Sequence, residues 1–100
     1  MILRILEEAQ AEISEASRWY DRRRSGLGED FLRELSSSLR EIEAHPSRFP
    51  KLRSRKARHC RRRHVRRYPF SIIYNVRIDE ILVIAVVHGH RRPGYWYGRG

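Results

Sequence analysis

A run of seven apolar residues near the C-terminus, Ile81 to Val87, constrains the fold most strongly. A strand with one solvated face alternates apolar and polar residues, whereas this run presents apolar side chains to both faces. It is also far shorter than the ~18 residues expected of a membrane span. The run therefore predicts the central strand of a sheet.

Apolar residues at steps of three and four predict two amphipathic helices in the first half. The first extends from Glu7 to about Arg24, and residues 25–28 (Ser-Gly-Leu-Gly) break it. Glu29 and Asp30 open the second, where negative charge suits the positive end of the helix dipole, and Pro46 ends it. The two apolar stripes are Leu6, Ala9, Ile13, Ala16, Tyr20 and Phe31, Leu35, Leu39, Ile42.

The remaining segments predict further strands. Residues 2–6 form a short one, residues 58–66 alternate loosely, and residues 70–76 alternate more clearly. Residues 45–56 form a loop punctuated by Pro46 and Pro50. With 100 residues the chain makes one domain, residues 1–100. We expect an α+β fold: a short N-terminal strand and an antiparallel two-helix hairpin packed on a three- to four-stranded, mainly antiparallel sheet.

Charge is distributed unevenly along the chain. Residues 1–44 carry a net charge of −3 and residues 45–100 a net charge of +13, which gives the overall +10. Such asymmetry concentrates a positive field on one part of a small molecule and attracts anions. It does not choose among nucleic acid, an acidic protein and a membrane surface. Arginine far outnumbers lysine, which suits bidentate binding of phosphate or carboxylate, although a genome rich in G and C gives the same bias.

Residues 48–67 contain 11 Arg and Lys residues and no Asp or Glu. Because an unpaired buried charge costs roughly several kcal/mol, at least one face of a strand here is solvated or meets a partner. Charges of this kind also protect an exposed edge strand from aggregation, but 11 exceed what that protection needs. We therefore expect a binding surface, to which Arg58, Arg62 and Arg66 contribute from one strand parity and Arg67 from the other.

The C-terminal tail offers a second group of candidates, which are His88, Arg91 and Tyr95. Histidine transfers protons near neutral pH, and arginine stabilises the charge of a phosphoryl transition state. Together such residues could cleave RNA without a metal. The alternative is that the histidines are surface residues and that Tyr95 and Trp96 pack under the sheet. No zinc-ligand spacing is present, so we expect no metal or cofactor. We expect Cys60 to be a small buried side chain.

The N-terminal apolar residues are too few and too soon followed by Glu7 and Glu8 to form a signal peptide. We therefore expect a cytoplasmic protein with no membrane partner.

An ordered series of short motifs resembles toxins of the RelE/ParE superfamily, over roughly residues 9–97. The motifs are Trp19-Tyr20, Gly26-Leu27-Gly28 with Phe31, Pro46, Phe49-Pro50, Arg67-Tyr68-Pro69-Phe70, Ile73-Tyr74, Val76, Ala85-Val86-Val87-His88, Arg91, Pro93 and Tyr95-Trp96. No single motif is diagnostic, but the ordered set is specific. The resemblance implies the toxin of a type II toxin–antitoxin pair, a class also described as plasmid stabilisation proteins, with a small antitoxin protein as its partner.

Two activities share the fold that this resemblance implies. ParE-like members bind DNA gyrase and block it without hydrolysis, whereas RelE-like members are mRNA endoribonucleases acting at the ribosome. The Trp-Tyr motif and the His88 and Arg91 ending look more like ParE. Cleavage stays open as an alternative, as does a non-toxic basic module that binds nucleic acid. The resemblance is also compatible with a toxin–antitoxin heterotetramer.

The resemblance extends the two sets of candidate residues. Arg61 and Arg63 join the tail residues as catalytic candidates, only under the cleavage alternative. Trp19 and Tyr20, which we expect to pack within the helical hairpin, join the arginines as partner-binding candidates.

Overall fold

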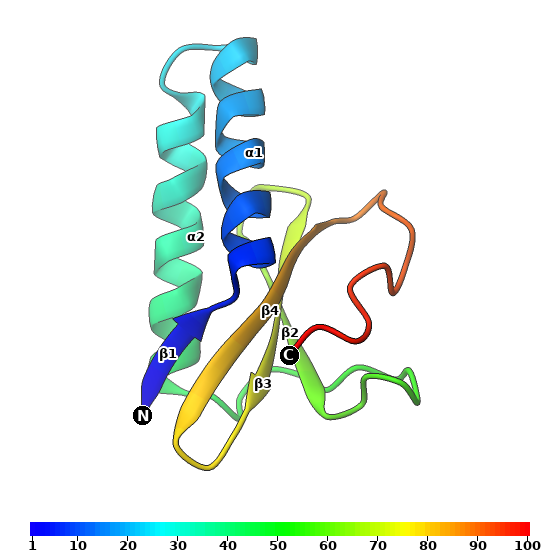
Figure 1. Cartoon of the computed structure of the whole chain (residues 1–100). Helices are drawn as coiled ribbons and strands as arrows, with labels where there is room; N and C mark the ends of the chain where they lie inside the picture. Colours follow the sequence, from blue (N-terminus) through cyan, green and yellow to red (C-terminus); the bar gives the residue numbers. More distant parts are fainter.

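Four strands form one mixed sheet in the computed structural model, which describes all residues from 1 to 100. They are β1 (Ile2–Ile5), β2 (Cys60–His64), β3 (Phe70–Val76) and β4 (Glu80–His88), in the spatial order β1-β4-β3-β2. β1 runs parallel to β4, and the other neighbouring pairs are antiparallel (Figure 1). The apolar run lies in β4, between β1 and β3, which confirms the predicted central strand.

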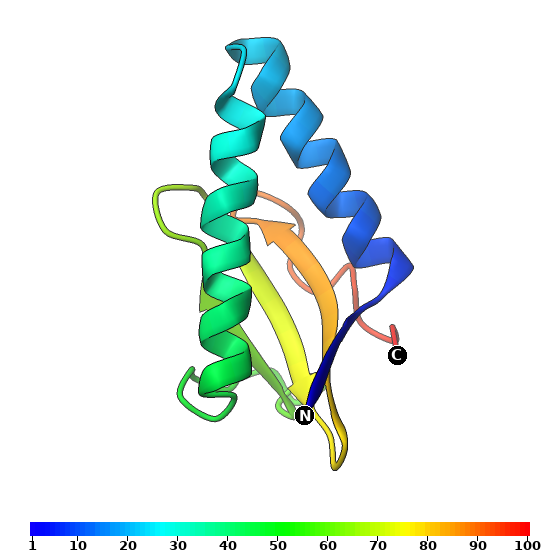
Figure 2. The same cartoon turned by 90° about the vertical axis from the view of Figure 1, so that its left-hand side faces the viewer.

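The helices α1 (Glu7–Arg23) and α2 (Leu27–Ala44) form a hairpin over one face of the sheet (Figure 2). The predicted stripes are the buried faces: Ile13 and Phe31, among others, pack with Ile72, Tyr74 and Val86 of the sheet. Because both helices bury one side against the same sheet face, the α+β prediction is confirmed. Neither helix combines the length and the apolar composition needed to cross a lipid bilayer.

The connection between the helices is shorter than predicted. α2 begins at Leu27, two residues before Glu29, because Gly26 adopts the left-handed conformation (φ 88°) that ends the turn at once. Gly28 lies inside α2 at a close contact with α1. A Cβ atom there would lie 2.3 Å from the backbone oxygen of Ser17, and its N–H donates to the Asp21 carboxylate at 2.8 Å. Gly26 therefore ends the turn and Gly28 allows the helices to pack closely, so neither glycine lengthens the loop.

The second face of the sheet is covered without helices. Loop residues 52–59 and the tail from residue 89 pack over it, on the side opposite the hairpin (Figure 1). The earlier loop residue Phe49 packs instead on the helix side. Trp96 and Ala57 pack there on Ile73 and Ile84, and Cys60 is only 1% exposed, which confirms the buried cysteine and the packing of Trp96. The basic strand is shorter than residues 58–66, because turns occupy the residues on both sides of Cys60–His64.

Candidate functional site

Alternation along β2 divides its arginines between the two faces of the sheet. Arg61 and Arg63 lie on the helix side. The Arg61 guanidinium donates to the backbone oxygens of Ser47 (3.1 Å) and Phe49 (2.7 Å). Arg63 donates to the Glu41 carboxylate of α2 at 2.6 Å, and this hydrogen bond lowers the pKa of Glu41 below its usual value. Both side chains therefore stabilise the packing of the loop and α2 on β2.

Arg67 forms a second connection to α2. It lies in the turn between β2 and β3 with a positive φ of 69°, and its guanidinium donates to Asp30 and Glu34, both at 2.9 Å. The neighbouring Tyr68 hydroxyl donates to Asp30 at 2.5 Å. This bond is the main cause of the lowered pKa of Asp30, while burial and the same bond raise the pKa of Tyr68 to about 12. Arg67 thus forms ion pairs within the fold, while its side chain stays 54% exposed.

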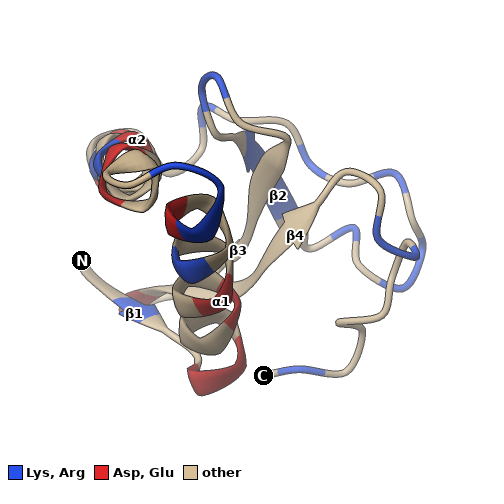
Figure 3. Ribbon diagram, turned by 90° about the horizontal axis from the view of Figure 1, so that it is seen from above, with Lys and Arg blue, Asp and Glu red and all other residues tan.

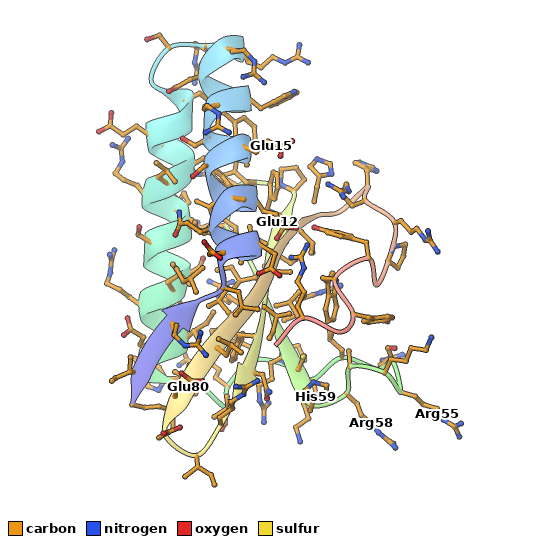
Figure 4. All side chains as sticks on the ribbon, viewed as in Figure 1. Glu12, Glu15, Arg55, Arg58, His59 and Glu80 are labelled. Atoms are coloured by element: carbon orange, nitrogen blue, oxygen red, sulfur yellow. The ribbon has the colours of Figure 1, made fainter.

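The basic stretch is only partly neutralised by the carboxylates of the hairpin. Of its 11 cations, Arg63 and Arg67 form ion pairs, so nine do not. Arg58, Arg62 and Arg66 are exposed and unpaired. Figure 3 shows the acidic residues gathered mainly on α1 and α2, and basic residues along β2 and the segments that cover the far side of the sheet. In Figure 4, Arg55 and Arg58 extend away from the fold.

A cavity of about 600 Å³, here called the α1 cavity, lies between α1, the start of β3 and the end of β4. Its lining residues are Glu12, Glu15, Ala16, Trp19, Tyr20, Pro69, Phe70, Val86, His88, Arg91 and Tyr95. The structure thus brings together three of the five catalytic candidates, but not Arg61 and Arg63, whose partners are the loop and α2.

The two aromatic residues of the Trp-Tyr motif differ in exposure. Trp19 is 44% exposed at the rim of the α1 cavity, with the Arg23 guanidinium 4.3 Å above its ring. Tyr20 is 9% exposed and contacts the rings of Phe31 and Tyr68 in the core. Tyr20 is therefore buried in the cavity wall, as the packing prediction for this residue expects. Trp19 is the aromatic side chain of the motif that a partner can reach.

Glu12 fixes one side of the α1 cavity, and sequence reasoning missed it. Its carboxylate accepts hydrogen bonds from the backbone N–H of Val86 (2.9 Å), the Tyr95 hydroxyl (2.6 Å) and the Arg99 guanidinium (3.1 Å). Burial, and then the bond to Glu12, raise the pKa of Tyr95. Figure 4 shows Glu12 and Glu15 on the side of α1 towards the C-terminal tail. In the sequence, Glu12 is one of several polar residues beside the apolar stripe, and nothing marks it out.

Comparison with known proteins is consistent with this architecture. The family model described as the ParE toxin of type II toxin–antitoxin system, parDE, matches residues 3–93. A solved structure described as the chromosomal ParDE TA system from P. aeruginosa is similar to the chain with a TM-score of 0.77 and 16% sequence identity, covering 88% of this chain and 95% of that one. No curated protein sequence matches. From the extent of the family match, the chain belongs to the ParE toxin family of type II toxin–antitoxin systems.

Proposed function

We propose that this toxin inhibits growth by binding DNA gyrase through protein–protein contacts in the cytoplasm. The observation that carries the proposal is the separation of Arg61 and Arg63 from the three catalytic candidates of the tail. Arg61 is held by two backbone oxygens and Arg63 by Glu41 of α2, while Tyr95 donates its hydroxyl to Glu12 of α1. Residues so engaged are not free to act together on one scissile phosphate, because catalysis needs its groups within hydrogen-bond reach of the same atoms.

We further propose that a cognate antitoxin neutralises the toxin by covering the α1 cavity. Its size lies within the ~300–1,000 Å³ that is typical of ligand-binding pockets, and its rim exposes Trp19, a residue type common at interaction hot spots. Glu15 lies exposed at the same rim and makes no ion pair. An antitoxin segment with an apolar side chain for the cavity and a basic side chain for Glu15 would fit it.

Two assays on the purified toxin test the proposed target. We expect the protein to inhibit supercoiling by gyrase and to leave mRNA intact on translating ribosomes. Cleaved mRNA with unchanged supercoiling would refute the gyrase proposal.

Two single substitutions, one in α1 and one in α2, test the proposed antitoxin surface. Trp19→Ala should weaken antitoxin binding by about thirtyfold or more, since hot-spot truncations cost roughly 2 kcal/mol or more and ~1.4 kcal/mol is a tenfold change. Leu32→Ala is the matched control, because Leu32 is 37% exposed on α2 and does not line the cavity. Equal affinities for the two variants would place the antitoxin elsewhere. The mass of the purified complex tests the predicted heterotetramer.

Endoribonuclease activity is the second candidate, and one observation favours it: His88, Arg91 and Tyr95 line the same cavity. The Arg91 guanidinium lies 4.2 Å above the Tyr95 ring, within reach of a phosphate entering the cavity. If this candidate is correct, Arg91→Ala abolishes mRNA cleavage while the circular dichroism spectrum is retained. Unchanged cleavage by that variant would remove Arg91 from the site.

A further inference from the structure

A second cavity, of about 660 Å³, lies on the sheet face that points away from the helices. We call it the Arg62 cavity. Its residues come from the loop after α2, from the sheet and from the C-terminal tail. They are Pro50, Lys51, Leu52, Arg53, Ser54, Arg62, Ser71, Val87, His88, Gly89, Arg91, Arg92, Pro93, Gly94, Tyr95, Trp96 and Tyr97.

The floor of the Arg62 cavity is set by strand register. Arg62, Ser71 and Val87 come from β2, β3 and β4, and Ser71 pairs directly with Val87. Arg62 shares its parity with Cys60, which packs in the core on this side, so its side chain belongs to the same face. Arg53 and Arg92 bring two more cations from the segments that fold over this face.

The charges of the Arg62 cavity have no counterpart in the fold. Five basic residues line it, and no Asp or Glu does. None of the five forms a salt bridge, unlike Arg63 and Arg67 on the other side of the sheet. Convergence of like charges in a concave site raises its potential and its attraction for anions. The fold pairs two arginines of the basic stretch, Arg63 and Arg67, with its own carboxylates, and leaves these five cations available for a polyanion.

We propose that the Arg62 cavity binds a single-stranded nucleic acid, whichever target the toxin acts on. Arginine guanidinium groups bind phosphate oxygens in bidentate fashion, and the Ser71 hydroxyl on the floor is a further donor. At the wall, Tyr97 exposes 37% of its surface. Sites for single strands combine a basic groove with aromatic rings on which bases stack.

The aromatic wall distinguishes this proposal from an acidic peptide as the ligand. A carboxylate-bearing segment would use the arginines but would gain little from the exposed Tyr97 ring. The concave shape also suits a single strand better than a duplex, whose grooves are read by protruding elements. The cations therefore contact the phosphates, and Tyr97 stacks on a base.

The test is fluorescence anisotropy with a labelled twelve-nucleotide oligothymidine between 50 and 200 mM KCl. The double variant Arg62→Gln with Arg92→Gln should lower affinity about tenfold at low salt. It should also reduce the slope of log affinity against log salt by about 1.4, because each phosphate contact in a single strand contributes ~0.7. The control is Arg22→Gln with Arg40→Gln, which removes the same charge from exposed, unpaired positions on the helices. It should leave affinity and slope close to those of the wild type.

A pair of tyrosine variants tests stacking. Tyr97→Leu should lower affinity about tenfold, and Tyr97→Phe should retain it, because one stacked base contributes ~1–3 kcal/mol. Circular dichroism confirms that each variant is folded. Equal loss in the two arginine pairs would show non-specific attraction and overturn the proposal. So would unchanged affinity of Tyr97→Leu, or displacement of the oligonucleotide by polyglutamate at equal charge concentration, which would indicate an acidic protein instead.

Discussion

Replacement of Glu12 by glutamine should detach the C-terminal tail from α1. The carboxylate accepts four hydrogen bonds, one each from Val86 and Tyr95 and two from Arg99, and its side chain is only 15% exposed. Hydrogen bonds to a charged group are worth about 1.5–3 kcal/mol each, but glutamine keeps one acceptor oxygen and loses the charge. We expect a net loss of about 2–3 kcal/mol in the free energy of unfolding. For a 100-residue domain this lowers Tm by roughly 10–20 °C.

Two measurements separate this local role from a general loss of charge. Thermal unfolding gives the stability, and hydrogen exchange resolves the tail peptide from residue 89 onward, which should lose protection first. Glu15→Gln is the matched control. Glu15 lies one turn further along α1 and lines the same cavity, yet it is exposed and accepts no hydrogen bond. Equal effects of the two substitutions, or unchanged tail protection in Glu12→Gln, would refute the reasoning.

Three further predictions concern the fold. Gly28→Ala should lower stability by about 1–3 kcal/mol in denaturant unfolding, since the added methyl has no room against α1; an increase, as in ordinary helix interiors, would contradict the close approach. The pKa values of Asp30, Glu41 and Glu80 are lowered in the fold. Their ionised carboxylates therefore stabilise the fold fully above the usual carboxyl pKa, and this stabilisation is lost as the pH falls through the folded pKa values. A Tm that rises from pH 5 to pH 2 would contradict this. Burial raises the pKa of the Cys60 thiol, so it should react with a disulfide reagent at neutral pH only after denaturation, and rapid labelling of native protein would be inconsistent with its position.

The strongly periodic parts of the fold could be predicted from the sequence. The apolar run of β4 and the two helical stripes depend on local spacing alone, and a local pattern is readable without knowing the rest of the fold. The start of α2 was mispredicted, because the same glycines that usually lengthen a turn here shorten it. The sequence Gly26-Leu27-Gly28 does not by itself reveal whether its glycines belong to a loop or to a close contact between helices.

The candidate site was less predictable, because its decisive contacts are long-range. Strand parity separates Arg62 from Arg61 and Arg63 in the sequence, but it does not say which parity meets α2. The pairing of Arg63 with Glu41 spans 22 residues, and that of Glu12 with Tyr95 spans 83. Contacts of this separation depend on packing, which no local pattern encodes.

The register of β2 therefore determines two properties of the molecule at once. In the observed register Cys60 is buried beneath the covering loop and Arg63 reaches Glu41, while Arg62 joins the unpaired cations of the opposite face. A slip of one residue would exchange the faces, because side chains alternate along a strand. It would bring Cys60 to the helix side and leave Glu41 opposite a different partner. The pairing that attaches β2 to α2 thus also fixes which arginines stay free, so the stability of the fold and the charge of the Arg62 cavity have a common structural origin.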